Sequence, residues 1–126
     1  MEDTVFAKII RREIPADILY EDEDTLVFLD IAPVSKGHTL VIPKKPVRNI
    51  FDADEETLAA IMRTVKKMAP ILREAVGAEG INIHSNHEAA AGQVVFHLHF
   101  HLIPRLKDDG LVMWPHQKYE PGEAAN

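Results

Sequence analysis

The sequence contains no cysteine, and this absence excludes disulfides, thiol catalysis and cysteine-ligated zinc sites. It also contains no apolar run near the roughly 18 residues that a membrane span requires. The chain begins MEDTVFAKII, which lacks the basic start and apolar segment of a secretory signal. We therefore expect a soluble cytoplasmic protein that does not act at a membrane.

Basic charge is also in short supply. The chain has 14 Lys and Arg against 20 Asp and Glu, for a net charge of −6 at pH 7. A protein that binds a nucleic-acid backbone neutralises many phosphates with a basic face, so we do not expect that partner. A small phosphorylated ligand is still compatible, because it needs only a few donors in one cleft, and the acidic runs at residues 21–24 and 52–56 are typical of solvated surfaces.

The length of 126 residues predicts one domain, residues 1–126, with a single core. Its last residues, about 119–126, are polar and small, and we expect them to fray. No repeat, linker or low-complexity segment divides the chain.

Runs of β-branched and apolar residues predict strands on both sides of one long helical pattern. Apolar residues at three- and four-residue spacing predict a helix over 53–76, with Asp52 as its N-cap, and a shorter helix covers 6–12. Strands are expected in a hairpin around the turn at 21–24, and over 38–43, 80–86 and 94–104. This order predicts an α+β fold with a mostly antiparallel sheet of about five strands, one long helix and one short helix.

Three of the seven histidines, His97, His99 and His101, stand two positions apart in FHLHFHLIPR, residues 96–105. Side chains alternate along a strand, so the three imidazoles share one face, and Leu98 shares the other with its apolar neighbours. The apolar face should pack against the long helix. The histidine face should meet water, a ligand or a polar element; chance exposure or ordinary core packing of three imidazoles in register is the simpler alternative.

A metal site is a second alternative, because His-x-His on a strand is a common zinc pair. The outer two imidazoles are roughly 13 Å apart along a strand at about 3.3 Å per residue, whereas ligands lie roughly 2.1 Å from zinc. At most two neighbours could share one metal, and His38 or His84 would have to supply a third ligand. We therefore predict no metal site and no cofactor.

Nucleophilic catalysis at phosphorus is the third alternative. A neutral imidazole is a good nucleophile near pH 7, and its phosphorus adduct is labile to water. The central histidine, His99, is best placed for attack, while its neighbours could fix its tautomer or donate to phosphate oxygens. The small-residue loop at 89–93, AAAGQ, could bring backbone N–H groups close to a phosphate.

The stretch HLHFHLI fits the pattern His-φ-His-φ-His-φ-φ, where φ is apolar, and the chain resembles the histidine triad family. The segments TVFAKIIRREIPADILYEDE, LVFLDIAPVSKGHTLVIPKK and AGQVVFHLHFHLIPR resemble the Hint branch and its bacterial relatives in order and spacing. The resemblance implies an α+β fold whose sheet continues across a two-fold homodimer. It also implies a covalent nucleotidyl-histidine intermediate.

The resemblance assigns roles to four histidines. His99 matches the nucleophile that attacks the α-phosphorus, and His101 matches the position that contacts the phosphate. His97 and His38 match the pair that supports the nucleophile from behind, with the His97 carbonyl holding the ring of His99.

The resemblance also implies a nucleotide site. Asp30 matches the carboxylate that binds the ribose hydroxyls, and Asn86 matches a contact to phosphate or leaving group. Gln93 and Val94 complete the predicted phosphate contacts, the latter through its backbone N–H. The apolar slot for a purine base, whose members could equally be plain core, is formed by Val5, Phe6, Ile9, Ile14, Phe28, Leu29 and Ile31.

Two departures from the family pattern bear on function. Thr4 and Ala7 stand where many bacterial relatives carry Cys-x-x-Cys, so their structural zinc is not expected here. Val94 stands where the Hint branch usually has a serine that helps to protonate the leaving group. This predicts slow turnover of amine leaving groups, unless Asn86, Gln93 or water supplies that function. The predicted function is hydrolysis of purine nucleoside phosphoramidates and nucleotidyl compounds; the alternatives are a dinucleoside polyphosphate hydrolase and a nucleotide-binding regulatory protein with vestigial activity.

Overall fold

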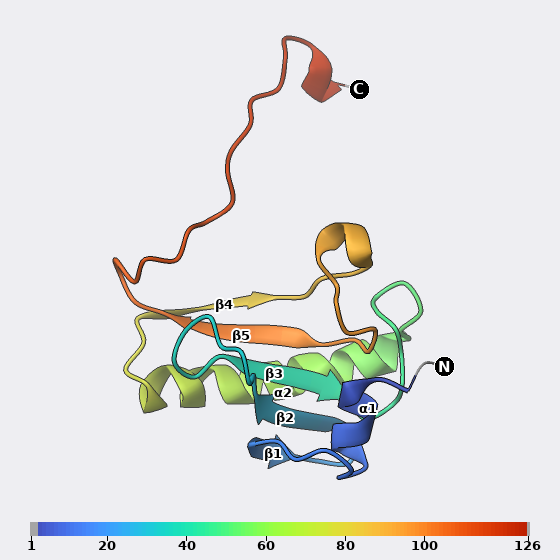
Figure 1. Cartoon of the computed structure of the whole chain (residues 1–126). Coiled ribbons are helices and arrows are strands. Elements are labelled where there is room, and N and C mark those ends of the chain that lie inside the picture. The colour runs from blue at the N-terminus through green and yellow to red at the C-terminus, as the bar shows by residue number, and fades with distance from the viewer. Residues whose placement is uncertain (1–2, 126) are drawn as a thin grey trace.

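The computed structural model describes residues 3–125, which form one five-stranded sheet with an α-helix on each face (Figure 1). In chain order the elements are α1 (Val5–Ile10), β1 (Ile18–Glu21), β2 (Thr25–Leu29), β3 (Thr39–Pro43), α2 (Glu55–Ala75), β4 (Gly80–His84), the 3₁₀ turn η1 (Ala89–Ala91), β5 (Phe100–Arg105) and the 3₁₀ turn η2 (Glu123–Ala125). The strand order is β1-β2-β3-β5-β4, and every neighbouring pair is antiparallel. The predicted α+β fold with a five-stranded antiparallel sheet is confirmed.

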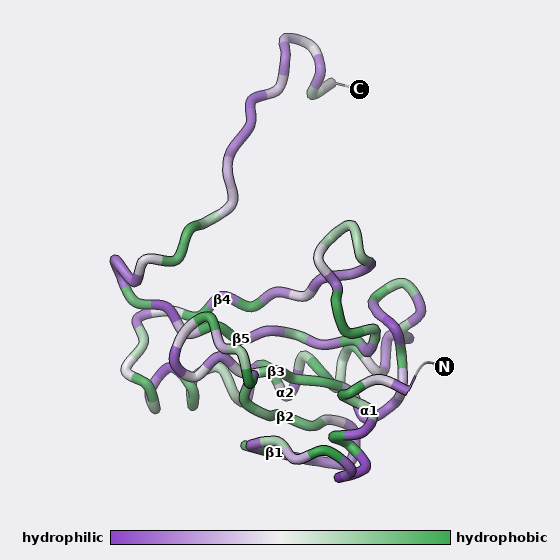
Figure 2. Tube along the Cα trace, viewed as in Figure 1, coloured by the Kyte–Doolittle hydropathy of each residue, from purple (hydrophilic) through white to green (hydrophobic). Residues whose placement is uncertain are grey.

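The sheet buries both of its faces in its central strands, which Figure 2 shows as hydrophobic over β2 and β3. Val27, Val41 and Leu102 pack against the apolar stripe of α2, as expected for the long helix. Neighbouring residues of the same strands, which point the other way, pack against α1 through Phe6 and Ile9. The α1 side of the sheet is the one on which Phe6 contacts the ring of His99.

The first turns of both helices differ from the predicted ones. The long helix begins at Glu55, because the Asp54 carboxylate accepts a hydrogen bond from the Thr57 N–H at 2.8 Å. The predicted cap, Asp52, is wrong: its carboxylate closes the preceding loop by accepting from the backbone N–H groups of Arg48 and Asn49. The short helix covers Val5–Ile10 and not 6–12, and Thr4 is its N-cap.

The predicted strand over 94–104 is wrong in its first half, since β5 begins only at Phe100. The ladder between β3 and β5 runs from Thr39 opposite Leu102 to Val41 opposite Phe100. Toward the other end of β3, Pro43 has no N–H with which to continue it. The segment that carries the first two triad histidines is held differently, by a hydrogen bond from the Leu98 N–H to the Val47 carbonyl at 2.8 Å.

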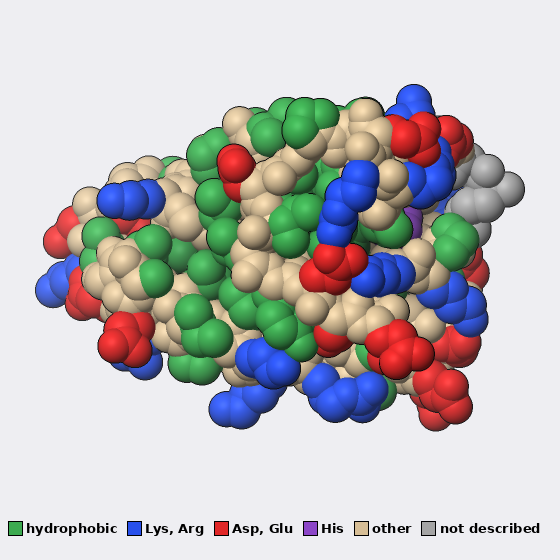
Figure 3. Space-filling model, turned by 90° about the horizontal axis from the view of Figure 1, so that it is seen from below, with side chains coloured by type: hydrophobic (Ala, Val, Ile, Leu, Met, Phe, Trp, Pro, Cys, Tyr) green, Lys and Arg blue, Asp and Glu red, His purple; other side chains and the backbone are tan. Residues whose placement is uncertain are grey.

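One face of the molecule is shown in Figure 3 and is mixed in charge. Acidic and basic side chains are interspersed there around apolar ones. Across residues 3–125, no helix combines the length and the apolar content that crossing a bilayer needs. After β5 the chain extends away from the sheet (Figure 1), and η2 lies in the segment predicted to fray, which stays a prediction; residue 126 lies outside the described residues.

Candidate active site

A pocket of about 490 Å³ lies on the α1 side of the sheet, between α1, β2 and the loop that precedes β5. All the residues predicted for the base slot line it, together with five residues predicted for sugar, phosphate and catalysis. The full lining is Val5, Phe6, Ile9, Ile14, Pro15, Ala16, Phe28, Leu29, Asp30, Ile31, Ala32, Leu40, Asn86, Gly92, Val94, Val95, His99 and His101. Sequence positions from four separate segments therefore converge on one cavity.

A second pocket, of about 520 Å³, lies between the β2–β3 region and the start of α2, away from the histidines. Charged side chains on its wall already pair with one another, as Lys45 Nζ does with Asp54 at 2.7 Å. The first pocket combines an apolar wall with a few convergent polar groups, which is the usual composition of a small-molecule site. We therefore assign the candidate site to the histidine pocket.

His99 is held in one tautomer by the chain itself. Its Nδ1 lies 2.7 Å from the His97 carbonyl oxygen, which can only accept, so Nδ1 carries the proton and Nε2 keeps the lone pair. The ring is only 7% exposed, and burial lowers the pKa of His99 below its ordinary value of 6.5, so the ring is neutral at pH 7. Ser85 donates to the His99 carbonyl at 2.6 Å and fixes the backbone at this point. The result is a neutral imidazole with a free Nε2 on the pocket wall.

His101 is set in the opposite tautomer by a chain of two hydrogen bonds. The Val34 N–H donates to His38 Nδ1 at 3.1 Å, so a neutral His38 carries its proton on Nε2. That Nε2 donates to His101 Nδ1 at 2.9 Å, which leaves the proton of His101 on Nε2. Burial first, and then the neighbouring His99, lower the pKa of His101 to about 4. At pH 7 the pocket therefore contains an acceptor nitrogen on His99 and a donor N–H on His101.

His97 and His38 lie behind the pocket, not in its wall. His97 is 2% exposed, its Nε2 donates to the Pro43 carbonyl at 2.8 Å, and its own carbonyl holds His99 as the resemblance implied. His38 bonds to His101 and not to the nucleophile candidate, so its expected support of His99 is corrected to support of His101. Burial lowers the pKa of both buried rings.

Asp30, His38 and His101 offer ligand atoms that all lie within 4.8 Å of one another, which is close enough to hold a metal ion. The tautomers argue against this use. His38 Nδ1 accepts from Val34, so its Nε2 bears a proton and has no lone pair for a metal unless the ring gives up a second proton. Asp30 Oδ2 lies 3.6 Å from that same Nε2, where it faces the proton. The three side chains fit a hydrogen-bonded relay better than a metal centre.

The loop between β4 and β5 lines the pocket with Asn86, Gly92, Val94 and Val95. Gly92 has φ +93°, a conformation that favours glycine, and a β-carbon there would lie 3.6 Å from Asn86 Nδ2. The side chain of Val94 is 84% exposed at the pocket mouth and brings no hydroxyl to it. Asn86 is the side-chain amide that lines the cavity.

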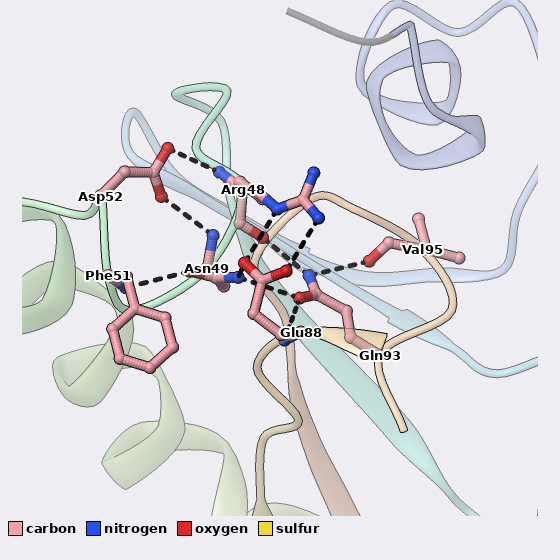
Figure 4. A network of polar contacts seen from close by, with 7 residues as sticks. All are labelled: Arg48, Asn49, Phe51, Asp52, Glu88, Gln93 and Val95. Atoms are coloured by element: carbon pink, nitrogen blue, oxygen red, sulfur yellow. Dashed lines mark hydrogen bonds and ion pairs between the residues drawn. The ribbon is translucent and has the colours of Figure 1, made fainter. Parts of the chain in front are cut away.

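Gln93 differs from its predicted role. The residue is 3% exposed and lies outside the pocket lining. The Gln93 Oε1 accepts from Asn49 Nδ2 and the Glu88 N–H, and its Nε2 donates to the carbonyls of Arg48 and Val95 (Figure 4). With both donor hydrogens and two acceptor sites engaged, Gln93 organises the loop and does not reach a phosphate.

Several residues of the site were not predicted. Val34, Pro43 and Ser85 act through one hydrogen bond each to a histidine ring or its backbone, and no pattern in a single sequence marks such positions. Glu88 has a positive φ of +77°, which its residue type does not predict. The small-residue run AAAGQ was the signal that predicted the loop.

Comparison with known proteins identifies the family. The family model described as HIT domain matches residues 11–108. The adenosine 5′-monophosphoramidase hnt1 of Schizosaccharomyces pombe is 41% identical over 121 residues, which cover 94% of this chain and 88% of the yeast protein.

Solved structures give the same result. The Streptococcus mutans protein SMU.412c has a TM-score of 0.91 at 43% identity, over 99% of this chain and 79% of that one. The histidine triad nucleotide-binding protein of Candida albicans has a TM-score of 0.83 at 35% identity, over 97% of this chain and 90% of that one. On the family match, the sequence identity and the shared fold, the chain belongs to the HIT family.

Proposed function

We propose that the protein hydrolyses purine nucleoside phosphoramidates and related nucleotidyl compounds at the α-phosphorus, through a covalent nucleotidyl-histidine at His99. The observation that carries the proposal is the 2.7 Å bond from His99 Nδ1 to the His97 carbonyl, because it leaves Nε2 as a lone-pair nucleophile in the pocket wall. The name of the S. pombe relative, an adenosine 5′-monophosphoramidase, supports the same reaction class.

The first step forms a bond between His99 Nε2 and the α-phosphorus and breaks the bond from phosphorus to the leaving group. The attacking ring becomes cationic, and its Nδ1–H remains on the His97 carbonyl, which stabilises that charge. His101 donates its Nε2–H to a non-bridging phosphate oxygen. The departing amine takes a proton from water, since neither Val94 nor the Asn86 amide has an acidic proton to give.

The second step returns the enzyme to its starting state. Water attacks the same phosphorus and releases one proton to the solvent, which replaces the proton taken up by the amine. The bond to His99 Nε2 breaks with its electron pair returning to the ring, and the nucleoside monophosphate leaves with the water oxygen. His99 recovers the neutral form that its burial favours. Each cycle thus consumes one water and releases one amine and one nucleoside monophosphate.

The other end of the pocket accounts for the nucleoside. Phe6 and Phe28 lie with their ring centroids 5.5 Å apart and, with Ile9 and Ile14, form flat apolar walls suited to a purine. Asp30 Oδ1 accepts from the Ala32 N–H at 2.9 Å, which orients the carboxylate while leaving lone pairs for the ribose hydroxyls.

The exposed Val94 favours one second candidate, a nucleotide-binding protein with vestigial activity. A valine at the pocket mouth supplies no proton, and general acid catalysis is typically worth about 10²–10⁴-fold. This candidate predicts tight binding of AMP with negligible turnover, whereas the main proposal predicts slow but measurable turnover.

The experiment combines adenosine 5′-phosphoramidate, acid-free quenching and mass spectrometry of intact protein and peptides. The expected result is a +AMP adduct on His99 during turnover, and none in His99→Ala. Circular dichroism should show that this variant still folds. Turnover without an adduct on His99, or an adduct on another histidine, would contradict the mechanism.

A cytoplasmic location and a homodimer stay predictions. The sheet ends at β1 and β4, so continuation of the sheet across a dimer has to use one of these edge strands. Light scattering after size exclusion gives the mass in solution that decides the second point.

A further inference from the structure

We propose that Arg48, Asn49, Glu88 and Gln93, here named the clasp, form a positioning device that holds the loop of residues 88–95 in the shape required to bind a phosphate. The clasp joins the segment before α2 to the loop before β5 (Figure 4). The inference deepens the proposed function, and it rests on the assignment of this end of the pocket to the phosphate.

The contacts within the clasp are directional. Arg48 donates from Nε to Glu88 Oε2 at 3.0 Å and from Nη2 to Glu88 Oε1 at 2.9 Å, a bidentate pair. Asn49 Nδ2 donates to Glu88 Oε2 at 2.7 Å and to Gln93 Oε1 at 3.1 Å. Arg48 first, and then Asn49, lower the pKa of Glu88 to about 2, so the carboxylate is charged at neutral pH.

The backbone of Glu88 shows why such a grip is needed. Its dihedrals, φ +77° and ψ 157°, fall in a region that is essentially confined to glycine. A residue with a side chain stays there only where its surroundings hold it. The bidentate ion pair holds Glu88 in this conformation, because it binds the side chain of the same residue whose backbone is strained.

The grip passes from Glu88 to the pocket through the backbone. The Glu88 N–H donates to Gln93 Oε1 at 2.8 Å, and the Gln93 N–H donates to the Glu88 carbonyl at 3.2 Å, so the two ends of η1 are tied together. Gln93 is flanked by Gly92 and Val94, which line the pocket beside Asn86. None of the four clasp side chains is among the described residues that line the pocket, so the clasp acts by positioning and not by contact.

The clasp therefore has a selective consequence. A loop held in its binding shape needs no reordering when a phosphate enters, which improves affinity for ligands that carry one. The base slot is built mainly from α1 and β2 at the other end of the pocket, and Val95 is the one residue of this loop that packs against its apolar cluster. Loss of the clasp should therefore weaken phosphate-bearing ligands much more than the nucleoside.

The test compares AMP with adenosine by isothermal titration calorimetry in Glu88→Ala, in Arg48→Met and in the double variant. We expect each single variant to weaken AMP roughly tenfold, in the range of coupling between contacting groups, with adenosine changed less than twofold. The double variant should be no weaker than the worse single one, because the two residues act as one unit.

The matched control is Asp109→Ala. It removes another bidentate pair, Arg105 Nε to Asp109 Oδ2 at 2.7 Å and Nη2 to Oδ1 at 3.0 Å, which lies beyond the end of β5 and away from the pocket lining. The ratio of AMP to adenosine affinity should not change in this control. If Glu88→Ala fails to fold, Glu88→Gln replaces Glu88→Ala in the double-variant comparison. The single variant Arg48→Met then tests the clasp without any change at Glu88.

The outcomes separate the inference from the function on which it rests. Equal losses of AMP and adenosine affinity, or no loss of either in a folded variant, overturn the clasp. If the unaltered protein binds AMP but turns over no phosphoramidate, the proposed reaction fails while the clasp is still measured by binding. If it binds no AMP, both are overturned.

Discussion

The two ends of the nucleotide pocket are built on different physical principles. At the apolar end, Phe6, Ile9 and Phe28 belong to the packed face between α1 and the sheet, and they offer area and shape. At the histidine end, His99 and His101 offer one lone pair and one N–H, each set by a specific hydrogen bond. Substitutions at the apolar end should change affinity in proportion to the area removed, because hydrophobic burial scales with area. Substitutions at the histidine end should cause large losses of activity, because removing a single hydrogen-bonding atom can change a tautomer.

The largest expected effect after loss of the nucleophile is at His101. Removing its donor in His101→Ala should reduce kcat about 10²–10³-fold, the usual cost of removing one donor to a developing oxyanion. The control is His84→Ala, which removes the ring stacked on His101 at 4.6 Å but takes nothing from the described pocket lining. Steady-state rates should differ widely between the two variants, and equal losses would contradict the assigned donor role.

Val94→Ser should raise activity where most substitutions lower it. A hydroxyl at this exposed position can pass a proton to the leaving group, so turnover of an alkyl phosphoramidate should rise on the order of tenfold, toward the lower limit for general acid catalysis. The same variant should not speed a substrate whose leaving group needs no proton, such as a nitrophenyl ester. Val94→Ala serves as the size control, and a gain in both variants would show that access, and not proton transfer, limits the rate.

Substitution at the apolar end should change binding more than chemistry. Ile14→Ala removes area from a partly buried wall of the pocket, and we expect KM to rise about fivefold, roughly 1 kcal/mol, with kcat nearly unchanged. Ile31 lines the same pocket but is 92% exposed, so Ile31→Ala should have the smaller effect. A loss in kcat equal to that of His101→Ala would remove the distinction between the two ends.

The same contrast separates what the sequence predicts from what it does not. Alternation correctly placed Leu98 in the core against α2 and His99 on the other face, because facing depends only on local geometry. The prediction of Asp52 as N-cap failed, because an aspartate two positions later also suits the cap and the preceding loop uses Asp52. A single sequence cannot supply contacts such as that from Val34 to His38, because they depend on where two loops meet.

The clasp is a further instance of this limit. The small-residue run AAAGQ predicted a loop that brings backbone close to a ligand, and Gly92 lines the pocket with a positive φ. Nothing in the residue type of Glu88 indicates a positive φ, because glutamate is an ordinary helix or loop residue. Its conformation follows from partners 39 and 40 positions away, Asn49 and Arg48.

The last prediction concerns stability, and it compares the two ends directly. Burial first lowers the pKa of His101 from its ordinary 6.5 to about 4, so between these values the unfolded chain binds more protons than the folded one. The contribution of neutral His101 to the free energy of unfolding is therefore fully present above pH 6.5, and it is lost as the pH drops toward 4. His101→Gln should make this fall shallower, as measured by urea midpoints at pH 7, 6, 5 and 4.5. Ile14→Ala should lower every midpoint by a similar amount, because apolar burial does not titrate. Parallel curves for the unaltered protein and His101→Gln would mean that folding does not lower the pKa of His101, and they would remove this difference between His101 and the apolar end.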